Sequence, residues 1–338
     1  MKWGRFFLLF RHLFFETLIK KLNMLAFVVM LALALNAYSS SPLESFTGLV
    51  LFCIFYSSVY FYNDLYDLER DKTRPLPHKL LARGIFSRTE YRNFWVASML
   101  LGFVLCTLFS PVFSFLALFA VLANFLRTKY LSSLPARTVS LFFVEFANLL
   151  TFWYAATKTL IYLPSLPPLS LYACVYIFAY ALYKKGLSLS GIHAVFLPFI
   201  FLSLYFSLPV FLSSGIALFL LAAFLLHIFT LKIFSPLGFS KVVYLQLLTL
   251  FVSSIIFLSY PLFLPEAQNL LALKEYGEKG FVMEYFYEKP SEILESSQSF
   301  FYKINNTARE VDLYWKKNLK SLVEKNYLLH SFTDAPVV

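Results

Sequence analysis

The chain has 338 residues, of which 59% are hydrophobic and only 14% are charged. In soluble globular domains about a quarter of the residues are charged. This composition therefore excludes a soluble globular protein and predicts a polytopic α-helical membrane protein. Residues 1–263 hold 20 Lys and Arg against 8 Asp and Glu, whereas residues 264–338 hold 9 Lys and Arg against 11 Asp and Glu. With this distribution, the net charge of +10 does not indicate nucleic acid as a partner. The basic excess therefore lies between apolar runs, as in membrane proteins.

Residues 1–22 mix aromatic side chains with Lys and Arg, which is typical of an amphipathic helix at a membrane interface. Nine apolar runs that can cross about 30 Å of hydrocarbon follow. They cover residues 23–40, 46–63, 93–109, 111–127, 138–157, 168–183, 190–208, 213–231 and 243–263. We therefore expect an all-α protein with a nine-span domain over residues 23–263.

The basic residues predict the orientation of these spans. With the N-terminus inside, the expected cytoplasmic segments carry 19 Lys and Arg, and the outer loops carry one, Lys158. The positive-inside rule then places the C-terminal tail outside. A cleaved first run would leave eight spans that begin outside, which requires a processing step. We expect an integral protein of a bacterial or archaeal cytoplasmic membrane.

Acidic residues are concentrated at the end of the second expected span. Only eight Asp and Glu precede residue 264, and four of them fall within residues 64–71. Asp64, Asp67 and Asp71 are spaced i, i+3 and i+7, so on a continuous helix they share one face, with Asn63 beside them. Like charges at a membrane boundary need a cation, and Mg²⁺ accepts carboxylate and phosphate oxygens. The alternative is a solvated acidic turn.

Basic residues follow this cluster directly, including Lys72, Arg74 and Lys79. Interleaved acids and bases suit a diphosphate bridged by a metal, because the cations hold the phosphate oxygens that the metal does not reach. The positive-inside rule accounts for the same basic residues without any ligand.

The sequence NDLYDLERD, followed by a basic loop with Pro75 and by Gly84, resembles the first aspartate-rich motif of the UbiA prenyltransferase superfamily. In that family the motif closes the second of nine helices on the cytoplasmic side, where the span count places it here. The resemblance covers roughly residues 20–263 and implies a UbiA-like bundle that uses Mg²⁺. The motif is most similar to the branch with decaprenyl-phosphate phosphoribosyltransferases. The donor implied is an isoprenoid diphosphate or a sugar diphosphate.

The family's second motif, at the end of the sixth helix, lacks its acid in this chain. The segment AYALYKKGLSLSG keeps Tyr180 and Lys184, which match a Tyr-x-x-x-Lys element of the family, and Lys185 follows. No Asp or Glu occurs between Glu145 and Glu266, which excludes a second carboxylate cluster. Either the lysines screen the diphosphate in place of a second metal, or catalysis was lost and they flank a span.

Two further polar features lie in the fourth and fifth expected spans. Arg127 and Lys129 stand where relatives have a Lys-Arg pair that contacts substrate, and span topology accounts for them equally well. Glu145 is a carboxylate inside the expected fifth span, which makes it a candidate for function or for a structural network. Asn148, three residues later, is its expected local partner.

Residues 264–338 form a separate, charged tail with no further span. Between residues 291 and 325, apolar or small residues recur in steps of four and three, which predicts a long amphipathic helix. A helix with one apolar face lies on the membrane, on the outer surface of its own protein, or against another subunit. Protein partners are therefore one of three expectations for this extramembrane tail.

The leading hypothesis is a transferase that moves a prenyl or phosphoribosyl group from a diphosphate donor to a lipid or aromatic acceptor. Its expected metal ligands are Asp64, Asp67 and Asp71, and its expected catalytic residues are Asp64, Asp67 and Lys184. The residues expected to bind substrate are Asn63, Lys72, Arg74, Lys79, Arg127, Lys129, Tyr180 and Lys185. The alternative is a catalytically degenerate family member that binds lipid or quinone, or assembles a membrane complex. A transporter is disfavoured because, apart from Glu145, the span interiors hold almost no charge.

Overall fold

The structure is a computed structural model that describes residues 4, 14, 16–35, 37–73, 79–130, 134–185, 199–204, 207 and 302–320. The expected spans at 213–231 and 243–263 lie outside these residues, as does most of the expected span at 190–208. Within the described part the secondary structure is helical and contains no strand.

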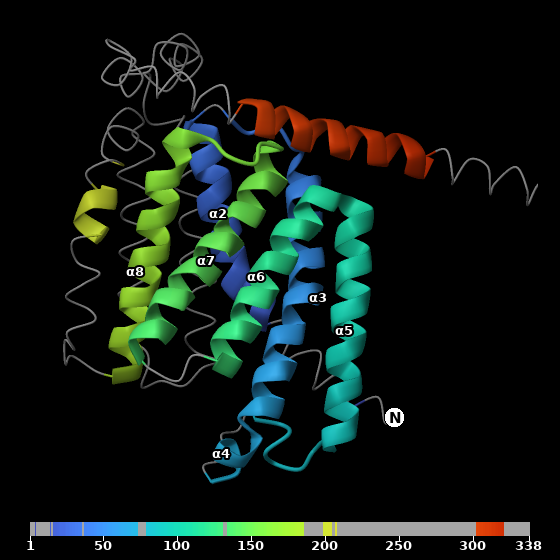
Figure 1. The fold of residues 1–338 in the computed structure, drawn as a ribbon, viewed down its shortest axis with the longest axis vertical. Helices are drawn as coiled ribbons and strands as arrows, with labels where there is room; N and C mark the ends of the chain where they lie inside the picture. Colours follow the sequence, from blue (N-terminus) through green and yellow to red (C-terminus); the bar gives the residue numbers. More distant parts are fainter. Residues whose placement is uncertain are drawn as a thin grey trace, which may run out of the picture.

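Six long helices run side by side and form the bundle (Figure 1). They are α2 (Glu16–Ala34), α3 (Pro42–Tyr66), α5 (Arg88–Phe109), α6 (Pro111–Tyr130), α7 (Leu134–Thr157) and α8 (Leu166–Lys185), with the short α4 (Leu68–Thr73) after α3 and a 3₁₀ turn, η2 (Leu163–Ser165), before α8. Four of these helices, α3, α5, α6 and α7, are long and apolar enough to cross a membrane. The described part is therefore an all-α membrane bundle.

Local sequence signals set where these helices begin. Ser41 caps α3 by accepting the Glu44 N–H, and Pro42 follows it at the first helical position, where its missing N–H costs nothing. Ser87 and Glu90 form a reciprocal capping box at the start of α5. Ser110 ends α5, and α6 begins at the next residue, so these two helices form a tight hairpin.

The core of the bundle is made by α2, α3, α6, α7 and α8. Its largest fully buried side chains include Phe52 and Phe55 of α3 and Trp153 of α7. Gly102 lets α5 approach α3 closely, because a Cβ at this position would lie 2.4 Å from the Cα of Phe55. This contact fixes the start of α5 beside the end of α3, where the acidic cluster lies.

The first helix differs from the expected span at 23–40. It begins at Glu16, inside the expected interfacial segment 1–22, and ends at Ala34. It begins early because Lys21 is buried and paired with a carboxylate, so this lysine does not mark a membrane boundary. It ends early because Ser39 and Ser40 bond to the carbonyls of Thr157 and Ala155, which turns residues 37–41 into a connection.

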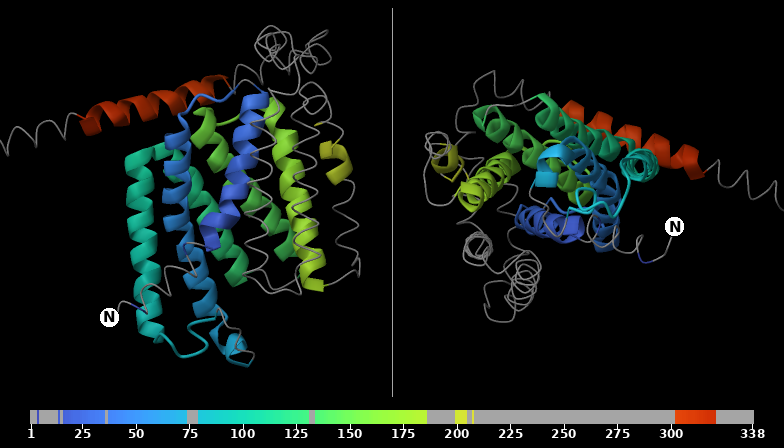
Figure 2. Two further views of the ribbon diagram at one scale, coloured as in Figure 1. Left: turned by 180° about the vertical axis from the view of Figure 1, so that it is seen from behind. Right: turned by 90° about the horizontal axis from the view of Figure 1, so that it is seen from below.

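A helix over residues 302–320 crosses the end of the bundle opposite α4 (Figures 1 and 2). The buried carboxylate of Asp312 accepts hydrogen bonds from Ser110 Oγ at 2.8 Å and from Tyr154 OH at 2.6 Å. The side chain of Asn305 bonds to the backbone of Leu160 and Ile161. The helix lies within the tail segment expected to be helical, 291–325, and rests on the bundle.

Candidate functional site

The acidic cluster lies where α3 ends and α4 begins (Figure 1). Asp67 ends α3 with φ −86° and ψ 4°, and its N–H still bonds to the carbonyl of Asn63. Leu68 then turns into a small core cluster with Phe61 and Tyr91. The expected continuous helix through residues 63–71 is therefore broken at Asp67, because burial of Leu68 redirects the chain.

Asp64 and Asp71 converge on one lysine across this break. Lys79 Nζ lies 2.6 Å from Asp64 Oδ1 and 2.8 Å from Asp71 Oδ2. Tyr91 OH donates to the other oxygen of Asp64 at 3.2 Å. Burial lowers the pKa of Lys79, but the two carboxylates outweigh it and raise the pKa above its ordinary value, so the ammonium is charged at neutral pH.

A short turn holds Lys79 in this place. Leu80 and Leu81 are buried against the end of α3, and the chain reverses at Gly84. The φ of Gly84 is +69°, a conformation that costs glycine little and other residues more. The loop that carries the basic residues is therefore anchored by apolar contacts next to the acidic cluster.

The other acidic side chains of the cluster, Asp67 and Glu69, pair with basic residues of α4. Asp67 pairs with Arg70, whose side chain is exposed, and Glu69 pairs with Lys72 at 2.9 Å on the exposed side of α4. Lys72 thus lies apart from the Asp64–Lys79–Asp71 group, whereas Arg70 links Asp67 to it, because Arg70 Nε also lies 3.9 Å from Asp71 Oδ1. Exposed ion pairs of this kind contribute little to stability and exchange readily for other partners.

The geometry of this group fits a bound cation. Asp64 and Asp71 already hold the positive charge of Lys79 between them, and their two carboxylates carry one more charge than this ammonium balances. Among the residues that the structure describes, no three Asp, Glu, His or Cys side chains gather as a metal site. Two carboxylates are nonetheless a usual protein contribution to Mg²⁺, which takes its other oxygens from water and phosphate. Asp64, Asp67 and Asp71 as metal ligands remain a prediction.

Asn63 connects the cluster to α6. Thr128 Oγ1 donates to Asn63 Oδ1 at 2.8 Å, and one turn earlier Asn124 accepts from Arg127 at 3.2 Å. Asn124 also donates to Tyr56 OH of α3 at 2.8 Å. These contacts place the expected substrate residues Asn63 and Arg127 at the same end of the bundle, on neighbouring helices.

A buried ion pair lies deeper in the bundle. Lys21 Nζ lies 3.1 Å from Glu145 Oε2, and Asn148 Nδ2 donates to the same oxygen at 2.8 Å. The ammonium also lies 4.6 Å from the centre of the Tyr56 ring. The expected pairing of Asn148 with Glu145 is confirmed. Lys21 was not predicted, because nothing local links residues 124 positions apart.

The remaining predicted residues are placed only in part. Arg74 lies outside the described residues, and Lys129 is exposed near the end of α6. Tyr180, Lys184 and Lys185 belong to α8, whose last turn reaches the same end of the bundle as α4 (Figure 1). The structure describes the backbone of these three residues and not their side chains. No sequence pattern indicates Tyr91 or Thr128, because a lone Tyr or Thr in an apolar helix is not distinctive.

Comparison with known proteins agrees with this architecture. The model of the UbiA prenyltransferase family matches residues 25–272. A solved structure of a UbiA homolog from Archaeoglobus fulgidus, bound to DMAPP and Mg²⁺, shares the fold with a TM-score of 0.50 and 14% identity, over 72% of this chain and 98% of that chain. No curated protein matches the sequence. Because the family model matches well over half of the residues of this chain, the chain belongs to the UbiA prenyltransferase family.

Proposed function

We propose that this protein is a Mg²⁺-dependent membrane transferase that moves a prenyl or phosphoribosyl group from a diphosphate donor to a lipid or aromatic acceptor. The observation that carries the proposal is that Asp64 and Asp71 both pair with the Lys79 ammonium at the C-terminal end of α3. Membership of the UbiA family supports a prenyltransferase-type activity. The Archaeoglobus homolog, with DMAPP and Mg²⁺ bound, supports this class of donor.

Each residue of the group has a role in this proposal. Asp64 and Asp71 hold Mg²⁺, which supplies Lewis-acid stabilisation of the departing diphosphate. Tyr91 orients the Asp64 carboxylate through its hydrogen bond. Lys79 turns its ammonium from the carboxylates toward phosphate oxygens, and Asp67 joins the site by leaving its exposed partner Arg70.

Cations from two other helices complete the diphosphate site that we propose. Arg127 of α6 contributes one charge, and its buried Nε–H has no acceptor within the described part of the chain. Lys184 and Lys185 close α8 at the same end of the bundle. Their two charges stand in for the missing acids of the second motif by screening the diphosphate directly.

A transfer assay tests the proposal. Membranes that contain the full chain are incubated with Mg²⁺, a lipid extract and a labelled isoprenyl or phosphoribosyl diphosphate, and the labelled lipid product is measured. We expect Asp64→Asn to lower product formation about 100-fold or more, because the metal loses a charged ligand. The matched control is Glu69→Gln, which removes an exposed acid of the same segment and should keep the wild-type rate. Equal rates for wild type and Asp64→Asn would exclude this function.

The alternative is a family member without catalysis that binds a lipid or quinone, or assembles a membrane complex. It is favoured by Lys79, which already pairs with both Asp64 and Asp71 without a metal. The absence of any acid between Glu145 and Glu266 also supports it. Stoichiometric partner subunits that co-purify with the full chain, and are lost when residues 291–325 are deleted, would support this alternative. A monomer with turnover would defeat it.

We further propose that the acidic cluster faces the cytoplasm and that helix 302–320 lies on the outer side. The basic residues of the expected inner segments support this orientation. A cysteine placed at Glu69, labelled in sealed cells, should react only with a reagent that crosses the membrane. Labelling by an impermeant reagent would reverse the orientation.

A further inference from the structure

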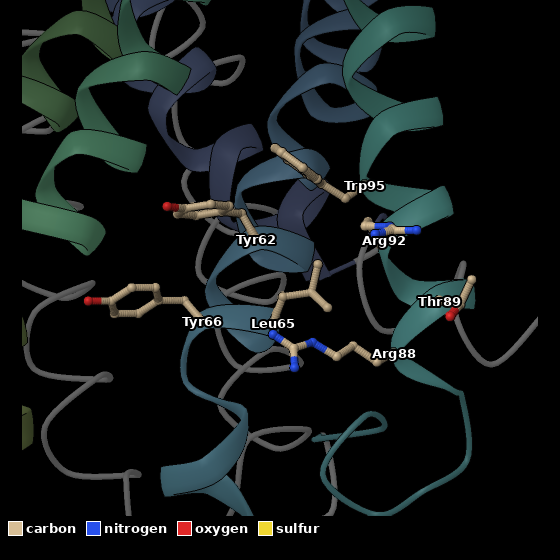
Figure 3. A pocket seen from close by; sticks show the side chains of 7 residues that line it. All are labelled: Tyr62, Leu65, Tyr66, Arg88, Thr89, Arg92 and Trp95. Atoms are coloured by element: carbon tan, nitrogen blue, oxygen red, sulfur yellow. The ribbon is translucent and has the colours of Figure 1, made fainter.

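A cavity of about 530 Å³ opens between the end of α3 and the start of α5 (Figure 3). Its lining residues are Tyr62, Leu65, Tyr66, Arg88, Thr89, Arg92 and Trp95. In Figure 3, Arg88 extends from α5 toward α3 and ends beside Leu65. The cavity therefore lies at the same end of the bundle as the acidic cluster.

This cavity is separate from the Asp64–Lys79–Asp71 group. Neither Lys79 nor Tyr91, the partners of Asp64, lines it. On α3, Asp64 lies about 160° around the helix from Tyr62 and Tyr66 and about 100° from Leu65. The two sites thus lie on adjoining faces of the same helix and share no charged residue.

The charged groups that line the cavity are both cations. Arg88 and Arg92 are exposed, one turn apart on α5, and neither has an ion-pair partner within the described part of the chain. A planar guanidinium recognises phosphate oxygens through paired charge-assisted hydrogen bonds. The cavity is therefore complementary to a ligand that carries an anionic phosphate.

The apolar part of the site indicates where such a ligand comes from. Leu65 and Trp95 line the cavity, and Phe125 of α6 packs against Trp95 and Tyr62 behind it. Beyond Arg92, α5 continues with the exposed apolar residues Val96 and Leu100, on a helix long enough to span the membrane. Aromatic and basic side chains at the end of a span are the usual partners of lipid headgroups.

We infer that this cavity binds an anionic phospholipid of the adjoining leaflet. The phosphate lies between Arg88 and Arg92, the glycerol region lies near Trp95, and the acyl chains follow the exposed surface of α5. The site is distinct from the proposed transferase site and does not depend on catalysis.

Native mass spectrometry of the full chain in detergent tests this inference with phosphatidylglycerol and phosphatidylcholine of identical acyl chains. We expect one phosphatidylglycerol per chain, bound about tenfold more tightly than phosphatidylcholine, because charge-assisted hydrogen bonds favour the anionic head. Arg88→Gln with Arg92→Gln should abolish this preference. Arg309→Gln with Lys317→Gln removes the same charge from the helix at the opposite end of the bundle and should leave the preference unchanged.

Fluorescence gives a second readout that does not depend on the arginine variants. Brominated phosphatidylglycerol should quench tryptophan emission saturably in the wild type, and Trp95→Phe should remove most of this quenching. Displacement of the lipid by an equal concentration of inorganic phosphate would show a site for free phosphate and overturn the lipid assignment. An unchanged preference in the folded double arginine variant would overturn the site itself.

Discussion

Two lysine–carboxylate pairs in this protein have opposite characters. At the end of α3, Lys79 and Asp64 lie 2.6 Å apart, and their side chains are 20% and 13% exposed. Inside the bundle, Lys21 and Glu145 lie 3.1 Å apart, and their side chains are 4% and 6% exposed. The first pair reaches water and shares its ammonium with Asp71, whereas the second is enclosed by α2 and α7. We infer that only the first can exchange its partner for a ligand.

The physical difference is the cost of separating the charges. A buried charge that loses its partner is poorly solvated, so we expect the pair Lys21–Glu145 to stay together. Lys79 can turn toward water or a phosphate at small cost, because its surroundings are partly hydrated. Burial therefore distinguishes an enclosed ion pair from a partly exposed one within the same bundle.

The largest expected effect follows from breaking the enclosed pair. Glu145→Gln leaves the Lys21 ammonium unpaired in the membrane, and we expect it to lower the free energy of unfolding by about 3–5 kcal/mol. Thermal unfolding in detergent measures this loss. The double variant Lys21→Met with Glu145→Leu should recover most of it, because neither charge remains. A single variant as stable as the wild type would show that the pair is not structural.

Asp312 offers an intermediate case, a buried carboxylate that is held by hydroxyl donors from Ser110 and Tyr154. Asp312→Ala leaves both hydroxyls without this acceptor, and we expect it to weaken the docking of helix 302–320 by about 1–3 kcal/mol. Amide hydrogen exchange over residues 302–320 should rise about tenfold or more. The control is Glu310→Ala on the exposed face of the same helix. Unchanged exchange in the Asp312 variant would mean that other contacts hold the helix.

The smallest stability effect is expected at the exchangeable pair. Lys79→Met removes the cation between Asp64 and Asp71, and we expect a loss of about 1–2 kcal/mol, because both carboxylates are partly hydrated. Mg²⁺ should restore this loss and should raise the unfolding temperature of the variant more than that of the wild type. An equal response to Mg²⁺ in both proteins would show that the ion does not bind between these carboxylates.

The sequence predicts the bundle well and the polar contacts only in part. Apolar runs locate α3, α5, α6, α7 and α8 within a few residues, because the length of a span and the absence of charge are local properties. The cluster at residues 63–71 is visible for the same reason. The helix break at Asp67 is not visible, because Leu68 is buried in a cluster with residues of the following turn and of α5, which no local pattern predicts.

Contacts between distant helices are the part that a single sequence does not contain. Lys21 was assigned to an interfacial helix because its basic side chain is usually a boundary signal. Only the packing of α2 against α7 brings it to Glu145. In the same way, no sequence pattern links Asn63 of α3 to Thr128 of α6. The Thr128 hydroxyl nevertheless donates a hydrogen bond to the Asn63 side chain. The pairing of Asn148 with Glu145 was predictable because three residues make one helical turn.

The central claim is that the exchangeable pair at Asp64 binds a metal and a diphosphate together. Calorimetric titration of the purified full chain with a non-hydrolysable isoprenyl diphosphate, with and without Mg²⁺, measures this directly. We predict binding that requires Mg²⁺ and is weakened at least about tenfold by Asp64→Asn, since a charged ligand of the ion is lost. The Glu69→Gln control should bind like the wild type. The claim would be contradicted if Asp64→Asn and the wild type bound the diphosphate with equal affinity, or if the affinity of the wild type were the same with and without Mg²⁺.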